Sequence, residues 1–143
     1  QQECKVLASD ILDLPINHMF TPGRNFPEEC KLIGTSSRSL IIELPYRILI
    51  ESVSLLVVDK NALSEVHVVH ESYSPSIQSI PSTLLKSSNS KLGEFIQHDH
   101  IAADHSLNKS QPSKYLFIRF DLKKCVRQPV LLKSINVKRR DGF

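Results

Sequence analysis

The chain of 143 residues contains 41% hydrophobic and 23% charged residues and has a formal net charge of +3, which is ordinary for a globular domain. One domain of this length buries about two-thirds of its unfolded surface, enough for a sizeable core. No apolar run approaches the roughly 20 residues that span a bilayer, since Glu51 and Asp59 interrupt the longest run.

The charge is distributed unevenly along the chain. Residues 1–108 contain eight Lys or Arg and thirteen Asp or Glu, a balance of −5, whereas residues 109–143 contain ten and two, a balance of +8. Such asymmetry is typical of proteins with a surface for an anionic partner. The alternative is that the two halves neutralise each other in the folded chain.

The N-terminal residues 1–5 lack the basic region and apolar core of a signal peptide, although a signal already removed would leave no trace. Three cysteines, Cys4, Cys30 and Cys125, form neither a disulfide framework nor a zinc-ligand pattern, because their number is odd and their spacing wide. A Cys4–Cys30 bridge with one free thiol is possible. We favour reduced, buried cysteines in an intracellular protein, nuclear or cytoplasmic.

The first block of predicted strands lies between residues 40 and 70. Apolar residues alternate over residues 40–44, as in a strand with one buried face, and Pro45 is expected to end that strand. Residues 48–58 are apolar at both parities, which predicts burial on both faces. Residues 65–70 are predicted to form the next strand.

Residues 71–113 are polar and rich in serine, and we expect a long loop-rich insertion here. Within it, residues 82–86 predict a short helical turn and residues 92–96 a short strand. Strands return at residues 114–122, where Leu116, Ile118 and Phe120 share one face, and at residues 131–139. The predicted class is an all-β jelly-roll sandwich forming one domain over residues 1–143, with its core at 38–139.

The order of these strands resembles the discoidin, or coagulation-factor type C, family of galactose-binding-like jelly rolls. The matching elements are residues 40–44 (LIIEL), 50–56 (IESVSLL), 66–68 (VHV), 114–120 (KYLFIRF) and 132–137 (LKSINV). Two features of that family are missing, namely a tryptophan near the early loops and a cysteine after the last strand. The resemblance therefore implies a divergent member, closer to the intracellular Doc-type docking modules, which bind partners and do not catalyse.

The densest group of chemically active side chains is His98, Asp99 and His100, followed by Asp104 and His105. Histidines and carboxylates at these offsets can hold a divalent metal. Solvated side chains in a polar segment account for the pattern equally simply. We predict no metal site, no cofactor and no catalytic constellation.

The basic residues at the end of the chain are the stronger functional candidates. Lys123, Lys124 and Arg127 lie between the last two strands, and residues 138–140 (Lys138, Arg139, Arg140) follow the final strand. Such groups attract acidic peptides, phosphates or nucleic acid. A solvated surface is the alternative.

These observations predict a non-enzymatic module that recognises a protein or peptide through loops at residues 20–27, 59–63 and 123–129. The outward parity of residues 115, 117 and 119 adds a possible partner-binding patch, unless the 71–113 segment covers it. Two alternatives stay open, namely a carbohydrate- or lipid-binding lectin and nucleic-acid binding through the basic C-terminal third. The residues expected to contact the partner are Arg24, Phe26, Asn61, Lys123, Lys124, Arg127, Tyr115, Phe117 and Arg119.

Overall fold

The computed structural model describes residues 3–11, 13–26, 30–33, 37–58, 62–71, 91–94, 100–103, 112–124 and 128–140. These residues form ten β-strands and no helix, and so none that could span a membrane. The strands are β1 (Cys4–Ser9), β2 (Met19–Phe20), β3 (Cys30–Leu32), β4 (Arg38–Ile48), β5 (Ile50–Val58), β6 (Leu63–Glu71), β7 (Lys91–Glu94), β8 (His100–Ala103), β9 (Ser113–Leu122) and β10 (Val130–Arg139).

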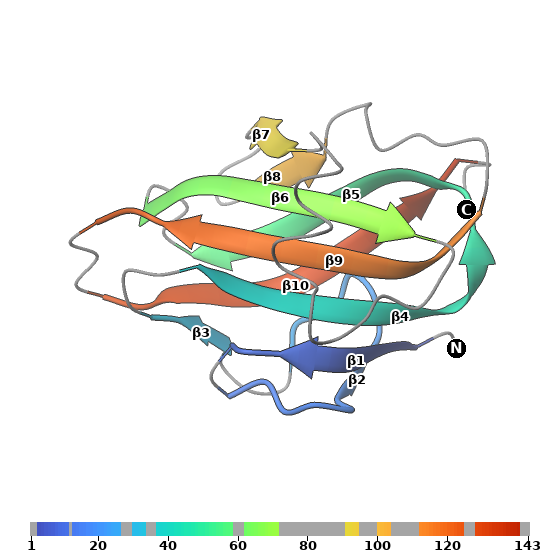
Figure 1. Ribbon diagram of the computed structural model, residues 1–143, viewed down its shortest axis with the longest axis horizontal. Helices are drawn as coiled ribbons and strands as arrows, with labels where there is room; N and C mark the ends of the chain where they lie inside the picture. Colours follow the sequence, from blue (N-terminus) through green and yellow to red (C-terminus); the bar gives the residue numbers. More distant parts are fainter. Residues whose placement is uncertain are drawn as a thin grey trace.

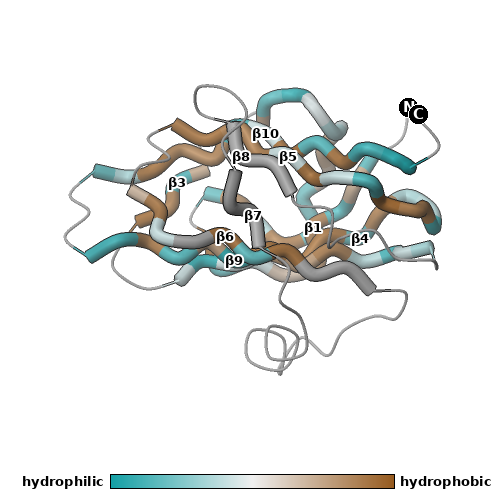
Figure 2. Tube along the Cα trace, turned by 90° about the horizontal axis from the view of Figure 1, so that it is seen from above, coloured by the Kyte–Doolittle hydropathy of each residue, from teal (hydrophilic) through white to brown (hydrophobic). Residues whose placement is uncertain are grey.

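The strands pair in the order β2-β1-β4-β9-β6-β7-β8-β5-β10-β3, and the pairings are antiparallel. This sheet folds over into two layers, with β1, β4, β9 and β6 in one and β8, β5, β10 and β3 in the other (Figures 1 and 2). The short strand β7 joins the layers on one side, between β6 and β8. The fold is therefore an all-β sandwich of jelly-roll type, as the sequence predicts.

The segment after β2 is hydrogen-bonded to β10 at the edge of the second layer. The backbone N–H of Gly23 donates to the carbonyl of Ile135, and that of Phe26 donates to the carbonyl of Lys133, both at 2.8 Å. Gly23 has a φ of +82°, a left-handed conformation that side chains rarely adopt. Residues 23–26 thus provide hydrogen-bond donors for two backbone carbonyl groups along the edge of β10. This limits pairing of that edge with strands of other chains.

The core lies between the layers, where the inward residues of each strand meet. On β9 the side chains of Leu116, Ile118 and Phe120 are fully buried, which confirms the predicted inward face. Strands β1 to β3 also contribute core side chains, among them Val6 and Leu32, both fully buried. The sandwich therefore begins well before residue 38.

Two details of the predicted strands are wrong. Pro45 does not end its strand, because β4 continues to Ile48. Its pairing with β9 jumps from Glu43↔Tyr115 to Ile48↔Ser113, so a proline without an N–H fits into the irregular stretch. Burial on both faces of β5 also fails at its end, where Val58 is exposed. The predicted turn at residues 82–86 lies outside the described residues.

Candidate ligand-binding site

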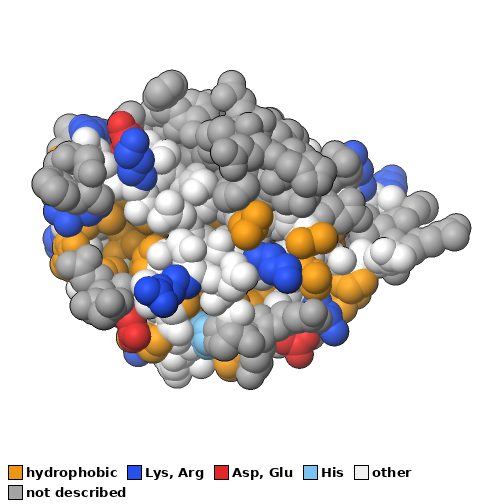
Figure 3. Space-filling model, turned by 180° about the vertical axis from the view of Figure 1, so that it is seen from behind, with side chains coloured by type: hydrophobic (Ala, Val, Ile, Leu, Met, Phe, Trp, Pro, Cys, Tyr) orange, Lys and Arg blue, Asp and Glu red, His pale blue; other side chains and the backbone are white. Residues whose placement is uncertain are grey.

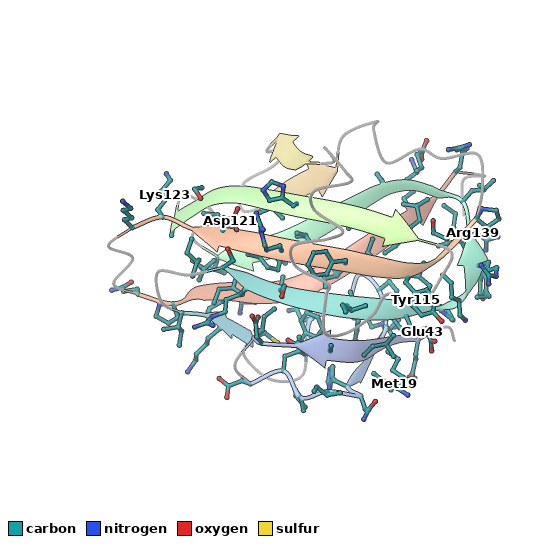
Figure 4. The ribbon with its side chains drawn as sticks, in the orientation of Figure 1. Met19, Glu43, Tyr115, Asp121, Lys123 and Arg139 are labelled. Carbon is teal, nitrogen blue, oxygen red and sulfur yellow. The ribbon has the colours of Figure 1, made fainter. Side chains whose placement is uncertain are left out.

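The irregular end of β4 shapes a cavity at one end of the sandwich. The extra residues of β4 bulge away from β9, and the side chain of Lys114 holds the bulge by donating to the carbonyl of Pro45 at 3.2 Å. The bulge leaves Tyr46 half-buried beside the entrance. The same end of the molecule holds the start of β1 and the end of β10, where Figure 4 labels Arg139.

The cavity has a volume of about 320 Å³. Its walls come from four separate parts of the chain, namely β1, the segment after β2, the end of β4 and the end of β10. The lining residues are Cys4, Thr21, Pro22, Leu44, Pro45, Tyr46, Ile48, Val137 and Arg139. Most of this lining is apolar, and its polar groups are concentrated on Tyr46, Arg139, Thr21 and Cys4.

Tyr46 and Arg139 form a fixed pair at the cavity. The guanidinium of Arg139 donates a hydrogen bond from Nη1 to the Tyr46 hydroxyl at 2.9 Å. The central carbon of the same guanidinium lies 5.4 Å from the centroid of the Tyr46 ring, a cation–π distance. The contact restricts the long arginine side chain.

Cys4 forms an inert part of the cavity wall. Its side chain is fully buried, and burial raises the pKa of the Cys4 thiol from 9.0 to about 12. The thiol therefore stays protonated at neutral pH and behaves as a small apolar group. Cys4 and Cys30 are both buried, and neither is in a disulfide.

Basic residues adjoin the lining residues in the chain. Arg47 and Arg140 are exposed next to lining residues, and Lys138 forms an ion pair of 3.0 Å with Glu51. Seen from behind, the left of Figure 3 shows hydrophobic side chains at this end of the molecule, with both Lys or Arg and Asp or Glu side chains near them. The nine lining residues include one cation and no carboxylate.

The three predicted recognition loops do not meet at one edge. Thr21 and Pro22, from the predicted loop at residues 20–27, line the cavity. The other two loops meet at the opposite end, where the N–H of Lys123 donates to the carbonyl of Ala62 at 2.9 Å (Figure 4). Lys123 and Lys124 are exposed there and do not border the cavity.

Two predicted contact residues are core side chains. Phe26 is only 8% exposed and packs against Phe20, with ring centroids 5.1 Å apart. Phe117 points away from the main core as predicted but is 2% exposed, because it packs with Ile41 in a second apolar cluster. The prediction of an exposed partner-binding patch at Phe117 is therefore wrong. Arg24 is exposed.

The remaining described candidates lie on the outer face of β9. Tyr115 is half-buried and pairs in register with Glu43, beside which Figure 4 shows it. Arg119 is engaged by Asp121, with Nε and Oδ1 2.9 Å apart and a hydrogen bond of 3.1 Å from Nη2 to Oδ2. This carboxylate also accepts a hydrogen bond of 2.6 Å from the Ser37 hydroxyl and lies 3.3 Å from Nε2 of His67.

Several predicted residues fall outside the described part of the chain. They are Asn61, Arg127, Cys125, His98 and His105. His100 belongs to β8, a strand that the sequence did not predict, but its side chain is not described. Among the described residues there is no group of three possible metal ligands.

Tyr46 is the residue that sequence reasoning missed. It follows Pro45, and the proline was interpreted as the end of a strand. The sequence feature that could have identified it is an aromatic residue beside a proline in an otherwise apolar strand. A bulge at such a position changes the direction of the neighbouring side chains. The basic residues 138–140 were predicted candidates, and Arg139 is one of them.

No family model and no curated protein sequence matches the chain. A comparison with solved structures finds a low-affinity xylan-binding module, CBM86, from the gut symbiont Roseburia intestinalis. The match has a TM-score of 0.51 at 12% sequence identity, and it covers 96% of this chain and 90% of that one. The similarity extends over most of both chains and agrees with the β-sandwich fold.

Proposed function

We propose that the protein is a non-catalytic carbohydrate-binding module whose ligand site is the cavity at Tyr46 and Arg139. The observation that carries this proposal is the pairing of an aromatic ring with a held guanidinium over an apolar hollow. Its volume of about 320 Å³ lies at the lower end of small-molecule sites, roughly 300–1,000 Å³. A short stretch of sugar fits a site of this size.

A sugar-binding site requires both apolar surfaces and hydrogen-bonding groups. A pyranose ring presents apolar C–H groups on its faces and hydroxyl groups around its rim. The Tyr46 ring and the walls formed by Leu44 and Ile48 suit the faces, and the donors of Arg139 and the Thr21 hydroxyl suit the rim. The similarity to a xylan-binding module supports the same class of ligand.

Binding without catalysis is consistent with the chemistry of the lining. A nucleophile or general base needs a pKa near the working pH. Within the lining, the Cys4 thiol has a pKa of about 12, and the arginine stays protonated. Among the described residues, the lining has neither a carboxylate nor a histidine to activate a hydroxyl group or a water molecule.

Recognition of a protein or peptide is the second candidate. It was the first expectation from the sequence, and the exposed pair Lys123 and Lys124 at the other end favours an acidic peptide. Nucleic-acid binding through the basic C-terminal third predicts an affinity that falls steeply with salt. Peptide recognition by this pair requires the Lys123 end of the molecule and carbohydrate binding the Tyr46 end, whereas the basic residues of the C-terminal third lie at both ends.

The test compares two tyrosines of similar burial. The purified protein is screened on a glycan array and titrated calorimetrically with xylo-oligosaccharides and the best array ligand. We expect Tyr46→Ala to weaken binding at least tenfold, or about 1.4 kcal/mol, whereas Tyr115→Ala stays within twofold. Charge reversal at Lys123 and Lys124 should leave glycan affinity unchanged.

Two results would overturn the proposal. The first is no binding to any glycan at millimolar concentration. The second is loss of binding in Tyr115→Ala but not in Tyr46→Ala, which would move the site to the outer face of β9. If an acidic peptide binds and charge reversal of Lys123 and Lys124 abolishes that binding, the second candidate replaces the first.

A further inference from the structure

We infer that the cavity binds the terminal sugar of a glycan chain and excludes sugars from the middle of a chain. The ligand class is a chain end, and the experiments below distinguish the two ends. This inference rests on the proposed function, since it names the part of a glycan that the same cavity holds.

The first observation is a segment that crosses between the two layers beside the cavity. It follows β2, and its residues Thr21 and Pro22 line the cavity. The next residue, Gly23, donates its N–H to the carbonyl of Ile135 in β10 at 2.8 Å. A backbone hydrogen bond therefore holds this first crossing against the second layer and fixes one wall.

The second observation is another crossing, the connection from β4 in the first layer to β5 in the second. Ile48 lines the cavity, and the carbonyl of Leu49 accepts a hydrogen bond of 2.8 Å from the N–H of Arg140, just after β10. The Lys114 side chain holds the same end of β4 by donating to the carbonyl of Pro45 at 3.2 Å. Contacts of this kind preorganise a wall before any ligand binds.

The third observation concerns the layers themselves. Val137 lines the cavity from β10, and Leu44 and Cys4 line it from β4 and β1. Cys4 and Leu44 are 0% and 1% exposed and belong to the core, so the core forms the inner end of the cavity. A groove that holds the middle of a chain has to be open at two sides. Walls from both layers, both crossings and the core instead suit a chain that enters by its end.

The size and the chemistry of the cavity agree with a terminal sugar. Its volume of about 320 Å³ is at the lower end of small-molecule sites and corresponds to about one or two sugar residues. Most of the walls are aliphatic or proline side chains, namely Pro22, Leu44, Pro45, Ile48 and Val137. An internal sugar carries a glycosidic bond on both sides, so one of its neighbours would collide with these walls.

The first test varies the length of the chain. Xylo-, cello- and manno-oligosaccharides of two to six residues are titrated calorimetrically into the folded protein. We expect the affinity of the best series to stay within twofold from trimer to hexamer, with one protein on each chain, because further residues lie outside the cavity. An affinity that rises beyond this limit, or two proteins on one hexamer, would overturn the inference.

The second test changes one chain end at a time. Borohydride reduction opens the ring of the reducing-end sugar, and a 4-O-methyl group blocks the opposite end. We expect one of these changes to weaken binding of the tetramer at least tenfold and the other to leave it within twofold. The sensitive end is the one that enters the cavity. Unchanged binding after both modifications would mean that internal sugars are bound.

Two valine substitutions assign the chain end to this cavity. Val137→Phe fills the cavity with a larger side chain and should weaken binding of the tetramer at least tenfold. Val58→Phe is the matched control on another strand, because Val58 is 40% exposed and is not among the lining residues, so binding should stay within twofold. Thermal unfolding checks that both variants are folded.

A third variant keeps the inference testable if Val137→Phe does not fold. Thr21→Val removes a hydroxyl group from the lining with little change in volume. It should weaken binding of the tetramer about threefold, while the affinity stays independent of chain length. Unchanged affinity in Thr21→Val would count against this cavity as the site.

The outcomes separate the inference from the proposed function. Binding that increases with chain length and is lost in Val137→Phe overturns the selection for a chain end and leaves the carbohydrate site standing. Equal binding by folded Val137→Phe and Val58→Phe removes the cavity from the role. Absence of binding to any glycan overturns the proposed function itself.

Discussion

An arginine at each end of the sandwich has different described contacts. At the end where β9 finishes, the guanidinium of Arg119 faces the carboxylate of Asp121, which also accepts a hydrogen bond from Ser37 and lies close to His67. At the other end, the guanidinium of Arg139 lies against the Tyr46 ring and lines a hollow whose nine described lining residues include no carboxylate.

The difference separates charged side chains that stabilise the fold from charged side chains that can bind a ligand. A carboxylate that engages a cation, a hydroxyl and an imidazole joins β6, β9 and the start of β4, and its role is structural. Arg139, by contrast, donates to an aromatic hydroxyl and lines the cavity. Sequence patterns treat the two arginines alike, and only their surroundings separate them.

The largest predicted effect is a loss of stability on substitution in the core, which both ends of the sandwich share. Phe120 is fully buried between the layers, and Phe120→Ala should lower the free energy of unfolding by about 3–5 kcal/mol because it leaves a cavity. Urea denaturation measures the change, with Met19→Ala at a 48%-exposed side chain as the control, expected within about 0.5 kcal/mol. Equal stabilities of the two variants would contradict a common core.

The next effect separates the two ends directly. Asp121→Asn should cost about 1–2 kcal/mol, because it removes the charge facing Arg119 at a carboxylate that is 20% exposed. Glu51→Gln is the matched change at the cavity end, where the ion pair with Lys138 is 39% and 58% exposed on its two sides. Solvent screens that pair, so the loss should stay below about 0.5 kcal/mol.

Chemical denaturation of both variants, with glycan titration of each, measures this contrast. Asp121→Asn should leave glycan affinity unchanged. A loss of affinity as large as that of Tyr46→Ala would mean that the two ends are coupled.

The smallest effect concerns Cys4 in the cavity wall. Its folded pKa of about 12 exceeds the ordinary value of 9.0, so above pH 9 the unfolded chain loses a proton that the folded chain keeps. The contribution of Cys4 to stability is therefore complete below pH 9 and decreases as the pH rises toward 12, by about 1 kcal/mol between pH 9 and pH 10.

The measurement compares urea denaturation of the protein and of Cys4→Ala at pH 8, 9 and 10. The stability difference between them should shrink with pH. A constant difference would show that the thiol is not desolvated, and Cys4 would then be open to alkylation at neutral pH.

Much of the architecture could be predicted from local pattern. The period-2 alternation of Leu116, Ile118 and Phe120 defines a buried strand face before any partner strand is known, because side chains of a strand alternate between its faces. The prediction that the strand ends at Pro45 was wrong. Strand propensity indicates an end at a proline, and it cannot show that the pairing of β4 with β9 is irregular there. It also failed at Phe117, whose outward parity is correct but whose neighbours bury it.

The sequence by itself determined the all-β class, the inward faces of the main strands and the basic character of the last third, since these depend on composition and on a two-residue period. Only the tertiary structure decided which loops share an end and that Arg139 lies against the Tyr46 ring. Cys4, Thr21, Tyr46 and Arg139 are far apart in the chain, and long-range strand pairing alone brings them to one cavity.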